Sequence, residues 1–233
     1  MGKKLKYYDD NDYKSDTYRA LSSQFTSCQH FESFYSSLID CEAKDEFLRV
    51  GSAYLFFVKN GDWHVHVPRS SPEVEYFTNS FKLVALLAII ESLSEKENVD
   101  FFFWLSEQNH KSLFPIADRG QLNKLYSEYK SEYGSIKGCR SFFANLAPST
   151  QHKLCKSVTI DGKPVESIEK LVAMIYQVRS RFAHESDVVL EISNSWCFSK
   201  EKNKEVAWNL PMMLLQSVFE EGVVAHFRSK LKT

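Results

Sequence analysis

The strongest constraint on the fold is a helical stripe of apolar residues between positions 165 and 186. These side chains recur at steps of three and four, at Ile168, Leu171, Val172, Ile175, Val178 and Phe182. Because an α-helix has 3.6 residues per turn, this spacing places them on one face of a continuous helix. The sequence therefore predicts a long amphipathic helix over 165–186 that packs against the core.

Helical periodicity also covers most of the remaining chain. Further helices are expected in 18–48, 75–95, 117–133, 135–146, after Pro148, and from Pro211 to about Lys230. The chain of 233 residues has only 8 Gly and 6 Pro and contains no linker-like tract. We therefore expect one mostly helical domain over 17–233. Residues 1–16, rich in Lys, Asp and Tyr without helical periodicity, are expected to form a loose N-terminal arm.

Two β-hairpins are predicted within this helical chain. The first spans 53–67, where two β-rich runs flank Asn60-Gly61, a dipeptide typical of a tight hairpin turn. The second is formed by 188–198 and 204–208, which bracket a polar turn. The predicted fold class is therefore mainly α, a helical bundle with two inserted β-hairpins.

Charge, cysteine spacing and hydropathy exclude several classes of protein. The 29 Lys and Arg are balanced by 30 Asp and Glu, which excludes nucleic-acid binding through a global basic field. Five single cysteines without a C-x-x-C pair exclude a zinc finger and favour a reduced, cytoplasmic protein. The longest strongly apolar run, 83–90, is far shorter than the roughly 20 residues that span a bilayer, so we expect no membrane segment.

The predicted helix 165–186 carries a second face that suggests chemistry. On a helical wheel Arg179 lies about 40° from Ile175, at the border of the apolar stripe, and His184 lies roughly opposite the stripe. Tyr176 and Ser180 fall between them. An arginine can hold a phosphate through two hydrogen bonds, and a histidine can transfer protons near neutral pH. Together they can cleave RNA without a metal or cofactor, and because one helix supplies one of each, a full acid–base set requires a homodimer.

The segment 171–185 resembles the signature helix of the HEPN superfamily, whose name abbreviates higher eukaryotes and prokaryotes nucleotide-binding. In that signature an aliphatic–Tyr pair precedes an arginine, a polar residue, a variable stretch and a histidine. The matching residues here are Ile175, Tyr176, Arg179, Ser180 and His184.

The resemblance implies a HEPN-like helical core over about 75–233 and a homodimer that pairs two motif helices. It also implies a metal-independent endoribonuclease that leaves 2′,3′-cyclic phosphate ends, in toxin or phage-defence systems with an antitoxin or regulatory partner. Arg179 and His184 would then be catalytic, with Ser180 and Tyr176 in support.

Other interpretations remain open from the residues alone. In the first, the chain is a non-catalytic module whose motif face binds RNA or a protein, with Arg179 as an anion anchor. In the second, Arg179, Arg181 and His184 only offset the helix dipole, and the protein is a monomer. His64 and His66 would share one face of a strand, but no neighbouring ligand completes a metal site, so none is predicted.

Overall fold

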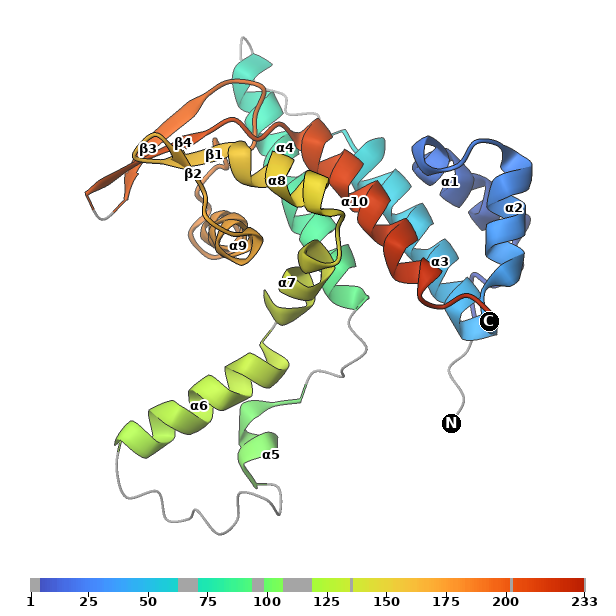
Figure 1. The fold of residues 1–233 in the computed structure, drawn as a ribbon, viewed down its shortest axis with the longest axis horizontal. Coiled ribbons are helices and arrows are strands. Elements are labelled where there is room, and N and C mark those ends of the chain that lie inside the picture. Colours follow the sequence, from blue (N-terminus) through green and yellow to red (C-terminus); the bar gives the residue numbers. More distant parts are fainter. Residues whose placement is uncertain are drawn as a thin grey trace.

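The computed structural model describes residues 5–62, 71–93, 99–106, 119–134, 136–201 and 203–232. This part of the chain is mainly helical, as predicted, and carries one small antiparallel sheet (Figure 1). The α-helices are α1 (Asn11–Leu21), α2 (Cys28–Ser37), α3 (Cys41–Tyr54), α4 (Ser71–Ser92), α5 (Phe101–Ser106), α6 (Arg119–Tyr133), α7 (Ile136–Ala144), α8 (Pro148–Lys156), α9 (Ile168–Glu185) and α10 (Met212–Arg228).

The N-terminal segment is ordered against the helical body. Helix α1 begins at Asn11, where the side chain of Asp10 caps it by accepting the backbone N–H groups of Asp12 and Tyr13. Before the helix, Asp45 Oδ1 of α3 accepts three successive backbone N–H groups of residues 6–8 at 2.6–2.8 Å. The prediction of a loose arm is therefore wrong over residues 6–16, because a carboxylate distant in sequence fixes the backbone.

The first predicted hairpin is also wrong. Helix α3 continues to Tyr54 and passes directly into a π-helix, η2 (Leu55–Lys59). Tyr54, Leu55 and Val58 are buried, which is helical spacing, whereas Phe56 and Phe57 are exposed. The Asn60 N–H donates to the Leu55 carbonyl at 2.9 Å, so Asn60 ends a helix instead of forming a hairpin turn. Residues 63–67, with His64 and His66, lie outside the described residues.

The sheet has the strand order β2-β1-β4-β3, with all neighbours antiparallel. Its strands are β1 (Val158–Ile160), β2 (Lys163–Pro164), β3 (Cys197–Glu201) and β4 (Lys204–Trp208). The hairpin β3–β4 lies within the second predicted hairpin, although residues 188–196 are not strand. The hairpin β1–β2 turns at Asp161-Gly162, where Gly162 has φ +75°. This hairpin was not among the two predicted ones, because its strands are only two or three residues long.

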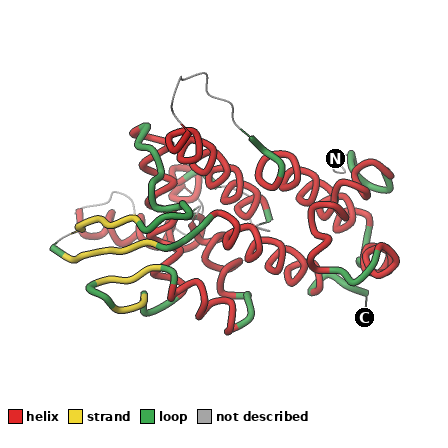
Figure 2. Tube along the Cα trace, turned by 90° about the horizontal axis from the view of Figure 1, so that it is seen from above, coloured by secondary structure: helices red, strands yellow, loops and turns green. Residues whose placement is uncertain are grey.

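The predicted stripe of α9 faces the main hydrophobic core. Ile168, Leu171, Val172, Ile175 and Val178 are buried there. Phe182 is half-buried, and its ring lies edge-on to Phe81 of α4 with centroids 5.1 Å apart. Figure 2 shows the sheet at one end of the molecule and both chain termini at the other.

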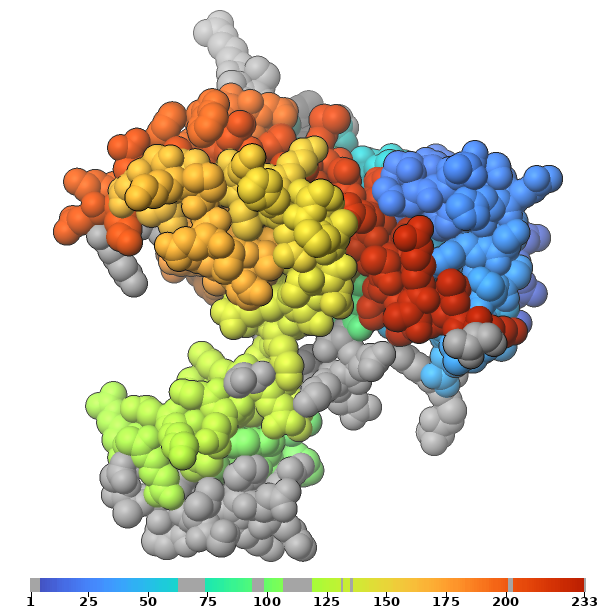
Figure 3. All heavy atoms as spheres, viewed as in Figure 1, coloured from blue at the N-terminus to red at the C-terminus, as the bar shows by residue number. Residues whose placement is uncertain are grey.

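Helices α5 and α6 form a separate projection below the main body (Figures 1 and 3). They have a small core of their own, made of Trp104, Leu105 and Leu125. Next to it, Phe102 and Phe103 are 77% and 63% exposed.

Candidate active site on helix α9

Both ends of α9 are fixed by local hydrogen bonds. At the start, the side chain of Ser167 accepts the backbone N–H of Lys170. At the end, Ser186 adopts a left-handed conformation, with φ 57°, and its N–H bonds the Phe182 carbonyl at 3.2 Å. These caps define the helix that carries the four predicted site residues.

Arg179 is half-buried beside Tyr176. Its guanidinium carbon lies 5.3 Å from the centre of the Tyr176 ring, and Nη1 is 3.5 Å from Tyr176 Oη, the long limit of a hydrogen bond. The Nε atom is buried without a hydrogen-bond partner. Among the described residues, no carboxylate lies within ion-pair distance of this guanidinium.

Arg181, only two residues further along, has a different environment. It forms an ion pair with Glu191, and its Nη1 lies 3.7 Å from the Asp187 carboxylate. Glu191 is 7% exposed, so the carboxylate of this ion pair is largely shielded from water. Arg181 therefore anchors the segment after α9 to the helix, a role that the motif spacing did not reveal. In the sequence, the acidic residues Asp187 and Glu191 after the helix could have indicated this role.

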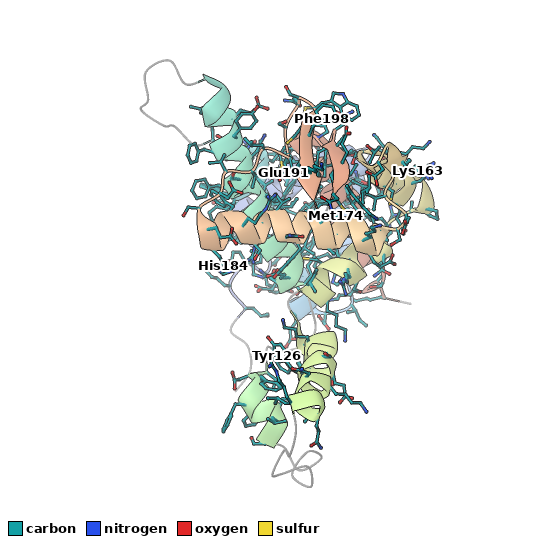
Figure 4. The ribbon with its side chains drawn as sticks, turned by 90° about the vertical axis from the view of Figure 1, so that its left-hand side faces the viewer. Tyr126, Lys163, Met174, His184, Glu191 and Phe198 are labelled. Atoms are coloured by element: carbon teal, nitrogen blue, oxygen red, sulfur yellow. The ribbon has the colours of Figure 1, made fainter. Side chains whose placement is uncertain are left out.

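His184 lies in the last turn of α9 and is exposed, near the C-terminal end of the helix (Figure 4). His184 lies five positions after Arg179, which corresponds to about 140° around the helix and about 7.5 Å along it. The two side chains therefore leave one helix in different directions. Within a single copy α9 does not bring them to one reacting atom.

The face of α9 away from the core is uncharged between residues 173 and 184. We call this surface the open face of α9; its members are Ala173, Tyr176, Gln177, Ser180 and His184. They fall within an arc of about 100° and are half-buried or exposed. Because Ala173 and Ser180 are small, another helix can approach this face closely. The arrangement suits a helix–helix contact that includes His184 and leaves Arg179 beside it.

Cys139 of α7 is fully buried near Arg179 and is not a nucleophile at neutral pH. Burial and, to a smaller extent, the Glu91 carboxylate raise the pKa of its thiol to about 12, and the Arg179 charge opposes both effects. The group is therefore a protonated thiol across the physiological range. This leaves Arg179 and His184 as the reactive candidates on this side of the molecule.

In the part of the chain that the structure describes, no group of three or more His, Cys, Asp and Glu residues is placed to hold a metal ion. No described helix is long and apolar enough to cross a membrane. No family model, curated protein sequence or solved structure matches the chain.

Proposed function

We propose that the protein is a metal-independent endoribonuclease of HEPN type that acts as a homodimer. Arg179 and His184 from both copies form the composite site, with Tyr176 and Ser180 in support. The resemblance of α9 to the HEPN signature supports a toxin or phage-defence role in the cytoplasm, with an antitoxin or regulatory protein as partner.

The observation that carries this proposal is the charge of Arg179. Arg181 is neutralised by Glu191 and Asp187, whereas Arg179 has no acidic partner among the described residues. A half-buried cation loses hydration without a compensating ion pair, so an anionic ligand stabilises it. The guanidinium geometry matches a phosphate through two parallel hydrogen bonds.

The reaction follows from these two side chains. The ribose 2′-oxygen attacks the adjacent phosphorus, the new O2′–P bond forms, and the P–O5′ bond breaks. One His184 accepts the 2′-hydroxyl proton, and His184 of the second copy donates a proton to the leaving O5′. Arg179 stabilises the negative charge that builds on the phosphoryl oxygens. The products are a 2′,3′-cyclic phosphate and a 5′-hydroxyl.

Replacement of either residue tests the proposal. In buffer with EDTA, Arg179→Ala and His184→Ala should each lower the rate of single-stranded RNA cleavage by at least about 100-fold, because each removes a charge or proton transfer from the transition state. Rates are measured on an end-labelled RNA, and the 3′ ends of the products are analysed for cyclic phosphate.

Two exposed residues on other helices serve as matched controls. His152→Ala on α8 and Arg228→Ala on α10 remove the same side-chain types and should leave the rate within about twofold. Cleavage that persists in Arg179→Ala or His184→Ala, or that requires a divalent metal, would contradict the mechanism.

A second candidate function is a non-catalytic RNA-binding or protein-interaction module. It is favoured because Arg179 and His184 point in different directions from one helix. Arg179 alone can then bind an anion, but the two side chains do not form a complete acid–base pair. In this case RNA binds without cleavage. Arg179→Ala then weakens binding, and His184→Ala leaves it unchanged.

A further inference from the structure

The sheet has one buried face and one open face. Val158, Val206 and Trp208 lie on the inner face and are buried. The strand register places Thr159, Ala207 and Phe198 side by side on the opposite face. We call this the outer sheet face; by the two-residue period of a strand it also includes Trp196, Lys200 and Glu205.

Two aromatic rings stand exposed on the outer sheet face. Trp196 is 55% exposed and Phe198 is 65% exposed. Their ring planes are nearly parallel, at 16°, and their centroids are 6.0 Å apart. Figure 4 shows Phe198 on the sheet, above α9 in that view. Unlike the exposed pairs Phe56–Phe57 and Phe102–Phe103, these two rings also border a hollow in the surface.

A hollow of about 430 Å³ adjoins these rings. It is lined by Thr159, Gly162, Trp196, Phe198, Glu205 and Ala207. Ala207 is small, and a Cβ added at Gly162 would meet no atom within 4 Å, so the space beside the rings stays open. The Thr159 hydroxyl and the Glu205 carboxylate add hydrogen-bonding groups to an otherwise apolar lining.

We propose that the outer sheet face binds an unpaired base of single-stranded RNA, stacked on Trp196 and Phe198. Flat exposed rings on a sheet are the common means of holding unpaired bases, whose faces are all aromatic. The Glu205 carboxylate accepts hydrogen bonds, and the edges of bases present N–H donors to it. If an apolar protein surface bound here instead, it would bury the Glu205 carboxylate without a hydrogen-bond donor, which costs free energy.

Charge along β3 also fits a nucleic-acid strand. Trp196, Phe198 and Lys200 follow one another at alternate positions, about 6.7 Å apart. A base on the rings therefore brings a neighbouring phosphate toward Lys200, which lies opposite Glu205 in the strand register. This local cation needs no basic charge on the molecule as a whole, which has a net charge of -1.

The position of this surface links it to α9, so the inference rests in part on the proposed function. Residues 187–196 connect the C-terminal end of α9 to Trp196, and the Arg181–Glu191 ion pair holds this segment on the helix. Ten residues span at most about 36 Å. A short RNA strand can therefore contact both the stacking surface and the end of α9.

Binding is tested with a fluorescein-labelled 12-nucleotide RNA that has no self-pairing, by anisotropy. His184→Ala provides the background, so that cleavage does not interfere. In that background Trp196→Ala and Phe198→Ala should each weaken binding at least tenfold, because each removes a stacking ring. Trp196→Tyr and Phe198→Tyr retain a ring and should stay within about threefold.

Exposed Met213 on α10 provides a matched apolar control. It is 74% exposed, and Met213→Ala should not change RNA affinity. RNA should also quench tryptophan fluorescence, and Trp196→Tyr should abolish most of that quenching. A duplex of the same sequence should compete poorly, because its bases are already stacked.

The outcomes separate this inference from the proposed function. If the alanine variants bind RNA like the background protein, or change only the oligomeric state, the stacking surface is wrong. If they lose binding while Arg179→Ala and His184→Ala still cleave, the surface stands and the proposed active site is wrong. If neither the His184→Ala protein nor the wild-type protein binds RNA, the stacking surface and the proposed active site are both wrong.

Discussion

Arg179 and Arg181 lie two residues apart on α9 but have opposite electrostatic environments. Glu191 is nearly buried, so loss of Arg181 would leave a carboxylate without its counter-charge, and this makes Arg181 structurally necessary. No comparable acid accompanies Arg179 among the described residues. The free charge of Arg179, together with the exposed His184, is what makes one end of α9 a candidate for phosphate chemistry.

The buried thiol of Cys139 predicts a decrease in stability at alkaline pH. Burial raises its pKa from an ordinary 9.0 to about 12 in the folded protein. Between these values the folded state keeps a proton that the unfolded chain releases, so the free energy of unfolding falls as the pH rises from about 9 to about 12. Urea unfolding at several pH values measures this slope.

The cysteine variants isolate this contribution. Cys139→Ala should make the alkaline slope shallower than in the wild-type protein, whatever it does to stability at neutral pH. Cys28 is exposed, and Cys28→Ala should keep the wild-type slope. Equal slopes in all three proteins would show that Cys139 ionises normally in the folded state.

At the scale of elements, tertiary contacts explain why 55–59 is helical. Lys59 Nζ donates to the Ala20 carbonyl at 2.6 Å and lies 2.9 Å from the buried Glu220 carboxylate of α10. Tyr54 Oη donates to the same carboxylate at 2.9 Å. A hairpin would break this buried network and remove Lys59, the counter-charge of Glu220, which is costly for a buried carboxylate.

Helices α1 and α3 pack so closely that one methyl group should be destabilising. A Cβ at Gly51 would lie 2.4 Å from Cγ2 and 2.8 Å from Cβ of the buried Thr17. Alanine gains about 1 kcal/mol in helix propensity over glycine, but this clash costs more because Thr17 is branched and enclosed. Gly51→Ala should therefore lower the free energy of unfolding by about 1–2 kcal/mol in urea titrations.

A second variant checks the cause. Thr17→Ala removes Cγ2 and Oγ1, so Gly51→Ala should cost less in the Thr17→Ala background than in the wild-type protein. If Gly51→Ala is neutral or stabilising, the spacing between α1 and α3 is wider than described.

For the whole molecule, the proposed active site requires two copies. The open face of α9 is uncharged and includes small residues, so Ala173→Glu would place two carboxylates against each other at a two-fold contact. The variant should be a monomer with RNA cleavage reduced at least 100-fold, while its melting temperature changes little. Light scattering measures the mass.

Ser33 on α2 provides the control for added charge. It is exposed on a helix remote in sequence from α9, and Ser33→Glu should remain a dimer with wild-type cleavage. A wild-type protein that is monomeric at assay concentrations yet cleaves RNA would exclude the composite site.

The sequence by itself determined the helical character of the molecule. The stripe from Ile168 to Val178 is buried as predicted, because a period of 3.6 residues is a local property of the chain. The hairpin β3–β4 was also predicted from a local pattern, namely β-rich runs on either side of a polar turn. The positions of Arg179 and His184 around α9 also follow directly from this periodicity.

Tertiary structure decided the rest. Residues 55–59 are helical because of Glu220, and residues 6–8 are held by Asp45, partners that lie far away in the chain. The contrast between Arg179 and Arg181, and the alignment of Thr159 and Ala207 beside Phe198, likewise depend on which segments meet in space. Local periodicity fixes which face of a helix or strand is apolar, whereas long-range contacts fix which charges are neutralised and which surfaces stay open.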